Sequence, residues 1–171
     1  MSTLWRTQHF KKLIVSRTIS NIGNGIAPIA LAFGVLHLPG TTPTSLSIVL
    51  AAQAVPLVIM LPIGGVLADK LGRARVIGIA DMIMSMSVMT IAVLFLTGNA
   101  TVPLLALLGV VNGTLAAFWY PAMSALPPEV VPDELLQSAN GYVAVAQNGG
   151  LIGGSALGGI LVATVGSGWA I

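Results

Sequence analysis

The stretch Gly65-Val-Leu-Ala-Asp-Lys-Leu-Gly-Arg-Ala-Arg75 decides how this chain is organised. It holds three of the seven Lys and Arg residues within a few positions, namely Lys70, Arg73 and Arg75. Apolar sequence without a charge precedes these residues over 46–68, and apolar sequence with one acid follows them over 76–96. Because a membrane-crossing helix needs about 20 apolar residues, the pattern predicts a short charged turn between two helices that cross a bilayer.

The other basic residues are also gathered in one place, since Arg6, Lys11, Lys12 and Arg17 stand at or just inside the N-terminus. Of the 171 residues, 56% are hydrophobic and 7% are charged, whereas a soluble domain carries about 25% charged residues. So few charges cannot cover a water-facing surface, which predicts an integral membrane protein surrounded by the lipid bilayer. The net charge of +2 comes without a basic stripe or an aromatic platform, so nucleic-acid binding is not expected.

Five stretches are long and apolar enough to cross a membrane, at about residues 18–38, 46–68, 76–96, 102–126 and 138–165. Each is expected to be a helix, because an unpaired strand edge in lipid leaves backbone groups without hydrogen bonds. The fold class predicted for residues 1–171 is therefore an all-α integral membrane bundle of five transmembrane helices. Residues 166–171 combine turn residues with a Trp and resemble the start of another helix, so we expect an incomplete N-terminal bundle that needs a missing C-terminal half.

The distribution of Lys and Arg predicts the orientation of the chain. By the positive-inside rule, the N-terminus and the segment 69–75 lie in the cytoplasm, and the uncharged connections 39–45 and 97–101 lie outside. The acidic segment 127–137 is then cytoplasmic as well, because the rule counts Lys and Arg rather than net charge. We expect a multi-pass protein of the inner (plasma) membrane with a cytoplasmic N-terminus.

The chain offers little for metal or covalent chemistry. It has no cysteine, and its two histidines, His9 and His37, stand at opposite ends of the first span. No nucleophile, base and ligand set is clustered along the sequence. We therefore expect no metal, no cofactor and no enzymatic activity.

The charged turn resembles the signature loop of the major facilitator superfamily, which is written G-x-L-A-D-R-x-G-R-K. Lys70 keeps the charge of the usual Arg, whereas Ala74 replaces a basic residue that Arg75 supplies one position later. The direct matches are Gly65, Leu67, Ala68, Asp69, Gly72 and Arg73.

The resemblance implies a conformational-switch loop formed by Gly65, Asp69, Lys70, Gly72, Arg73 and Arg75. Glycines let the backbones approach and turn sharply. The Asp69 carboxylate can accept hydrogen bonds from Arg73 or from a neighbouring helix N-terminus, which would latch the cytoplasmic side in one state. The alternative interpretation is a solvated loop whose charges only set the topology.

The fifth span resembles the antiporter motif of facilitator-type exporters, G-x-x-x-G-P-x-x-G-G. The matching glycines are Gly150, Gly154, Gly158 and Gly159, and Ser155 stands where the motif has Pro. Small residues four apart let helices pack closely in lipid, so the motif predicts either a packing face or a gating element.

Four polar residues within the spans are candidates for a cavity or for ion coupling, namely Asn21, Asn24, Asp81 and Asn112. The resemblance implies that the first and fourth helices line the substrate path. Each Asn could equally form a hydrogen bond between helices. Asp81 is either a protonatable coupling group or an interfacial acid paired with Arg17, Arg73 or Arg75.

The segment Pro121–Asn140 resembles the fourth-to-fifth loop of the enterobactin exporter and macrolide efflux group of that superfamily, and the overall resemblance covers essentially the whole chain. It implies the N-terminal half of a twelve-helix secondary transporter that works by alternating access. The expected activity is proton-driven efflux of a small lipophilic molecule, such as a drug, a macrolide or a siderophore. The alternative is a truncated or non-transporting membrane subunit that packs with a partner through its glycine-rich fifth helix.

Overall fold

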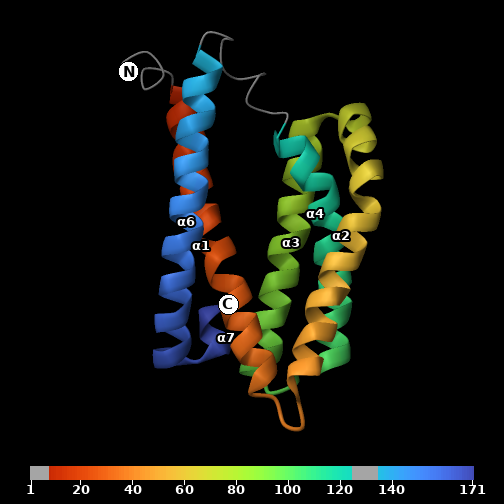
Figure 1. Ribbon diagram of the computed structural model, residues 1–171. Helices are drawn as coiled ribbons and strands as arrows, with labels where there is room; N and C mark the ends of the chain where they lie inside the picture. Colours follow the sequence, from red (N-terminus) through yellow and green to blue (C-terminus); the bar gives the residue numbers. More distant parts are fainter. Residues whose placement is uncertain (1–7, 125–134) are drawn as a thin grey trace.

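The computed structural model describes residues 8–124 and 135–171, and side chains from residue 14 onward. Five long helices run along a shared direction and a short sixth closes the described chain (Figure 1). Their bounds are α1 Gln8–Leu36, α2 Pro43–Leu71, α3 Arg73–Leu96, α4 Val102–Ser124, α6 Leu136–Val165 and α7 Ser167–Ala170. The predicted all-α class is confirmed.

Each long helix carries an apolar segment of membrane-spanning length. These segments are Ile14–Leu36, Pro43–Leu71, Arg73–Leu96, Val102–Ser124 and Leu136–Val165. The last two residues of the predicted fourth span, Ala125 and Leu126, lie outside the described residues. Residues 69–71 complete α2 and residues 73–75 begin α3, so the turn between these helices is much shorter than the expected charged segment 69–75.

The helices associate in two groups. α1 packs along α6, whereas α2 packs along α4, with α3 on the other side of α4 (Figure 1). We call the end of the bundle that holds Asp69 and Arg73 the charged end, and the end that holds the α1–α2 turn the opposite end. α7 contacts α1, α3 and α6 at the opposite end.

Buried apolar residues show how the two groups are joined. At the opposite end, one cluster of Val35, Val49, Ile91 and Leu105 unites α1, α2, α3 and α4. At the charged end there are two clusters instead. One lies around Ala139 between α6 and α1, and the other lies among α2, α3 and α4 and is formed by Ala68, Val76, Ile77 and Ala122.

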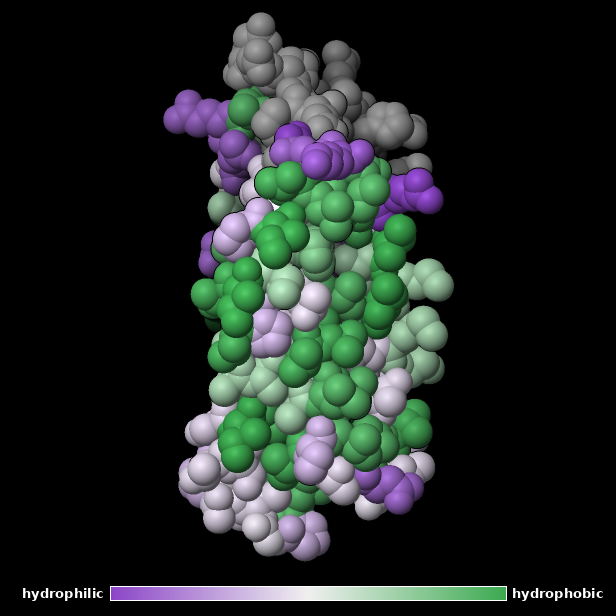
Figure 2. Space-filling model, turned by 90° about the vertical axis from the view of Figure 1, so that its right-hand side faces the viewer, coloured by the Kyte–Doolittle hydropathy of each residue, from purple (hydrophilic) through white to green (hydrophobic). Residues whose placement is uncertain are grey.

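The outer surface of the bundle is more apolar than the surface of a water-soluble protein. Figure 2 shows a broad hydrophobic band between hydrophilic residues at the charged end and paler, more polar residues at the opposite end. Large apolar side chains stand far out of the bundle, among them Val58 at 70%, Met89 at 70% and Ile152 at 71% exposure. Such an apolar outer surface is expected of helices that contact the hydrocarbon core of a bilayer.

Candidate functional site

The turn between α2 and α3 consists of a single residue, Gly72. Its φ of 88° lies in the region that L side chains rarely adopt, so glycine is required there. The Gly72 carbonyl accepts hydrogen bonds from the backbone N–H groups of Arg75 and Val76, both at 3.1 Å, which starts α3 directly after the turn. The reversal therefore brings the end of α2 and the start of α3 together.

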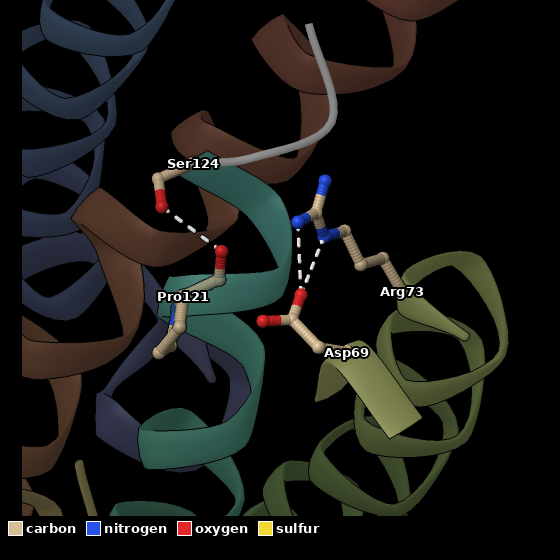
Figure 3. Close-up of polar contacts among 4 residues, drawn as sticks. All are labelled: Asp69, Arg73, Pro121 and Ser124. Atoms are coloured by element: carbon tan, nitrogen blue, oxygen red, sulfur yellow. Dashed lines mark hydrogen bonds and ion pairs between the residues drawn. The ribbon is translucent and has the colours of Figure 1, made fainter. Parts of the chain in front are cut away.

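Asp69 and Arg73 face each other across this turn (Figure 3). Arg73 Nε donates to Asp69 Oδ1 at 3.0 Å, and Arg73 Nη2 donates to the same oxygen at 2.8 Å. The second carboxylate oxygen, Oδ2, takes part in neither bond. The side chains are 30% exposed for Arg73 and 63% exposed for Asp69, so the pair is open to water. Such exposed pairs contribute about 0.2–1 kcal/mol, which makes this contact easy to exchange.

The end of α4 lies beside this ion pair (Figure 3). Gly65 of α2 faces Pro121, since a Cβ built on Gly65 would lie 3.7 Å from the Pro121 Cβ. Ser124 Oγ donates to the Pro121 carbonyl at 2.9 Å near the end of α4. The other members of the predicted switch, Lys70 and Arg75, are exposed at the same end. The structure thus brings all six predicted switch residues to one end of the bundle.

The glycines of the fifth span lie against α1. A Cβ on Gly154 would lie 2.9 Å from the Ile22 carbonyl carbon, and one on Gly158 would lie 3.1 Å from the Ile26 Cα. Gly150 is equally close to α1, whereas a Cβ on Gly159 would meet no atom within 4 Å. Three of the four motif glycines therefore form a packing face that α1 covers. Gly149, Gly153 and Gly159 of the same helix have no atom within 4 Å of a Cβ, so a partner that packs through the glycine-rich fifth helix stays an alternative.

A second close glycine contact joins α2 to α4, and sequence reasoning missed it. A Cβ on Gly113 would clash with the Gln53 backbone, and one on Gly64 would clash with the Ala117 backbone. Gly109 lies nearly as close, with its Cβ position 3.2 Å from the Val49 carbonyl oxygen. The four-residue spacing of Gly109, Gly113 and Ala117 is the signal that could have revealed this interface.

The polar candidates in the spans are not gathered at one point. Asn21 is 7% exposed and lies against Gly150, whereas Asn24, on the same helix, is exposed. Asn112 in α4 is 8% exposed, and its Oδ1 is buried with no hydrogen-bond partner. Asn21 and Asn112 thus lie within helix interfaces of the described bundle. Their predicted cavity role stays a prediction.

Asp81 is exposed on α3. The Arg17 guanidinium lies over the Trp119 ring of α4, 5.0 Å from the ring centroid. Of the three basic partners suggested for Asp81, Arg73 is engaged with Asp69. The pairing predicted for Asp81 stays a prediction. Across the residues that the structure describes, no group of three or more metal-ligating side chains occurs.

Comparison with known proteins adds three findings. The family model for the Major Facilitator Superfamily matches residues 13–171. The chain is 32% identical to the multidrug efflux pump Tap of Mycolicibacterium fortuitum over 160 residues, which cover 90% of this chain and 39% of that protein. It is 32% identical to the quinolone resistance protein NorA of Staphylococcus aureus (strain MRSA252) over 122 residues, or 71% of this chain and 30% of that protein. The chain thus spans less than half the length of these relatives.

Proposed function

We propose that this chain, which belongs to the Major Facilitator Superfamily, forms the first helix bundle of a transporter that exports small lipophilic molecules. The proposal is carried by the similarity to a multidrug efflux pump over 90% of the chain. The similarity to a quinolone resistance protein supports the same class of substrate. Because the chain spans 39% of the efflux pump, the pathway is proposed to need a second bundle that these residues do not supply.

In this proposal the charged end faces the cytoplasm of a cell with the protein in its plasma membrane. Lys70, Arg73 and Arg75 lie at that end, and Lys11 and Lys12 belong to the first turns of α1, which begins at the same end. Lys and Arg in short connections are retained in the cytoplasm. Substrate would be taken from this side and released at the opposite end.

We propose that Asp69 can exchange its contact with Arg73 for a contact with another bundle. A pair worth about 0.2–1 kcal/mol cannot by itself reverse a two-state equilibrium, which takes about 5.5 kcal/mol to move from 1:99 to 99:1. The pair can, however, be given up at little cost when another bundle offers a donor to Asp69. Its exposed carboxylate, with Oδ2 outside both hydrogen bonds, suits such an exchange. The driving free energy must then come from the coupling ion and the substrate.

We propose the proton as that coupling ion, with Asp81 as the candidate carrier in this bundle. A carboxylate within a membrane-spanning helix is costly and commonly serves transport. Asp81 lies in the α3 span, and its side chain is exposed in this bundle. The competing role is a structural acid that steadies Arg17, and a neutral variant separates the two. A drug, a macrolide or a siderophore as cargo, and placement in the enterobactin and macrolide exporter group, stay predictions.

A retention experiment tests the proposal. The full reading frame that contains this chain is expressed in cells that lack their main efflux pumps, and retention of a fluorescent quinolone is measured with and without an uncoupler. Lower retention that the uncoupler reverses is the expected result. Retention equal to that of empty-vector cells, for the quinolone and for a panel of macrolides and other lipophilic drugs, would contradict the proposal.

A further inference from the structure

Among the described residues, no shared apolar cluster joins the two helix groups at the charged end of the bundle. The α1–α6 pair and the α2–α3–α4 group share one apolar cluster at the opposite end, but they have separate clusters at the charged end. Within the described residues, apolar packing thus joins the two groups at one end only. A bundle joined in this way can splay at its other end unless a further contact holds it.

Arg17 and Trp119 supply such a contact. Arg17 belongs to α1, and its guanidinium lies 5.0 Å from the ring centroid of Trp119 on α4. Trp119 packs against the cluster of the α2–α3–α4 group, and its Nε1 is buried without a hydrogen-bond partner. The ring is therefore fixed by packing, and its face is what it offers to α1.

Arg17 is partly buried where it meets the Trp119 ring. Arg17 lies within the α1 span, where a positive charge is costly unless it meets an acid or an aromatic face. Here it meets the aromatic face of Trp119, which belongs to the other helix group.

We infer that the stacking of Arg17 on Trp119 is the tie that holds the α1–α6 pair to the α2–α3–α4 group at the charged end. Arg17 and Trp119 are positioning residues. They keep Asn21 and Asn24 on α1 at a fixed place relative to the Asp69–Arg73 turn, so the described helices move as one body. The inference concerns contacts inside this bundle and does not depend on export, its direction or its coupling ion.

Distance measurements between spin labels test the tie directly. The chain has no cysteine, so labels go only where cysteines are introduced. One pair, Ser138→Cys with Ala74→Cys, reports on the charged end, and a second pair, Ala163→Cys with Thr97→Cys, reports on the opposite end. All four positions are exposed. Distances are measured in lipid nanodiscs by pulsed electron paramagnetic resonance for the whole chain.

The test variants remove either side of the contact. We expect Arg17→Met and Trp119→Leu each to raise the ratio of splayed to closed bundles by about 5- to 30-fold at the charged end, as loss of a partly buried cation–π contact implies. Trp119→Phe keeps an aromatic face and should stay near the parent distances. The distances of the opposite-end pair should not change in any variant.

Arg75→Met is the matched control, because it removes an exposed arginine of the same end. Equal distances in Arg17→Met and Arg75→Met at the charged end would overturn the inference. A change of both label pairs together would also overturn it, since general loosening rather than release of a tie would then explain the result. Neither outcome would bear on whether the full protein exports drugs.

Discussion

Replacing Gly154 by alanine tests the packing of α1 against α6. The added Cβ would lie 2.9 Å from the Ile22 carbonyl carbon and 3.0 Å from its Cα, and closer still to its carbonyl oxygen. These atoms belong to the backbone of a helix and cannot turn aside as a flexible side chain could. The two helices would have to separate by about 1 Å to restore ordinary contacts between carbon atoms.

The expected cost follows from this enforced separation. Overpacking of a well-packed interface lowers the free energy of unfolding by about 1–3 kcal/mol. Alanine also gains up to about 1 kcal/mol of helix propensity over glycine, which partly masks the loss. Gly153→Ala is the matched control, because it adds the same methyl group to the same helix where no atom lies within 4 Å. The difference between the two variants isolates the interface.

The assay is unfolding of the purified chain in mixed micelles with increasing dodecyl sulfate, followed by circular dichroism. We expect Gly154→Ala to have a free energy of unfolding about 1–3 kcal/mol below that of Gly153→Ala. If the two variants agree within about 0.5 kcal/mol, the range of ordinary surface substitutions, then α1 does not lie against α6 as described.

Three further predictions follow from the same structure. Asp69→Asn should lower the free energy of unfolding by less than about 1 kcal/mol, yet it should impair drug export by the full protein. Unchanged export would refute the proposed role of Asp69 as an exchangeable contact on the cytoplasmic side. Asp81→Asn should abolish the dependence of export on a pH gradient, whereas retained dependence would leave Asp81 a structural acid. Gly113→Ala should destabilise the chain through a clash with the Gln53 backbone in a dodecyl sulfate titration, relative to Gly78→Ala, whose Cβ meets no atom within 4 Å. Equal stability of these two variants would show that α2 and α4 are not in close contact.

The helices could be predicted from sequence because a lipid bilayer permits few backbone conformations. A long apolar stretch in lipid must satisfy its own backbone hydrogen bonds, so length and hydropathy suffice to identify a span. The shortness of the α2–α3 turn could not be read in this way. Hydropathy falls where charges begin, but Asp69 and Arg73 stay helical while carrying their charges beyond the apolar region.

The candidate site was only partly predictable. The glycines of α6 are recognised as a motif because many of them lie close together in the sequence. Gly109 and Gly113 of α4 also pack closely against α2, but α4 is not unusually rich in glycine. The contact of Arg17 with Trp119 joins helices far apart in sequence, and no local pattern indicates which helices become neighbours. Residues that act through tertiary contacts between spans therefore need the structure.

The most direct test of the central claim is uptake of a fluorescent quinolone into inside-out membrane vesicles that hold the full protein. In these vesicles the cytoplasmic face is outside, so export appears as uptake. The account predicts that acidifying the vesicle interior drives uptake, and that an uncoupler stops it. Uptake equal to that of vesicles without the protein, with and without the gradient, would contradict the claim that this chain is part of a proton-driven exporter of such molecules.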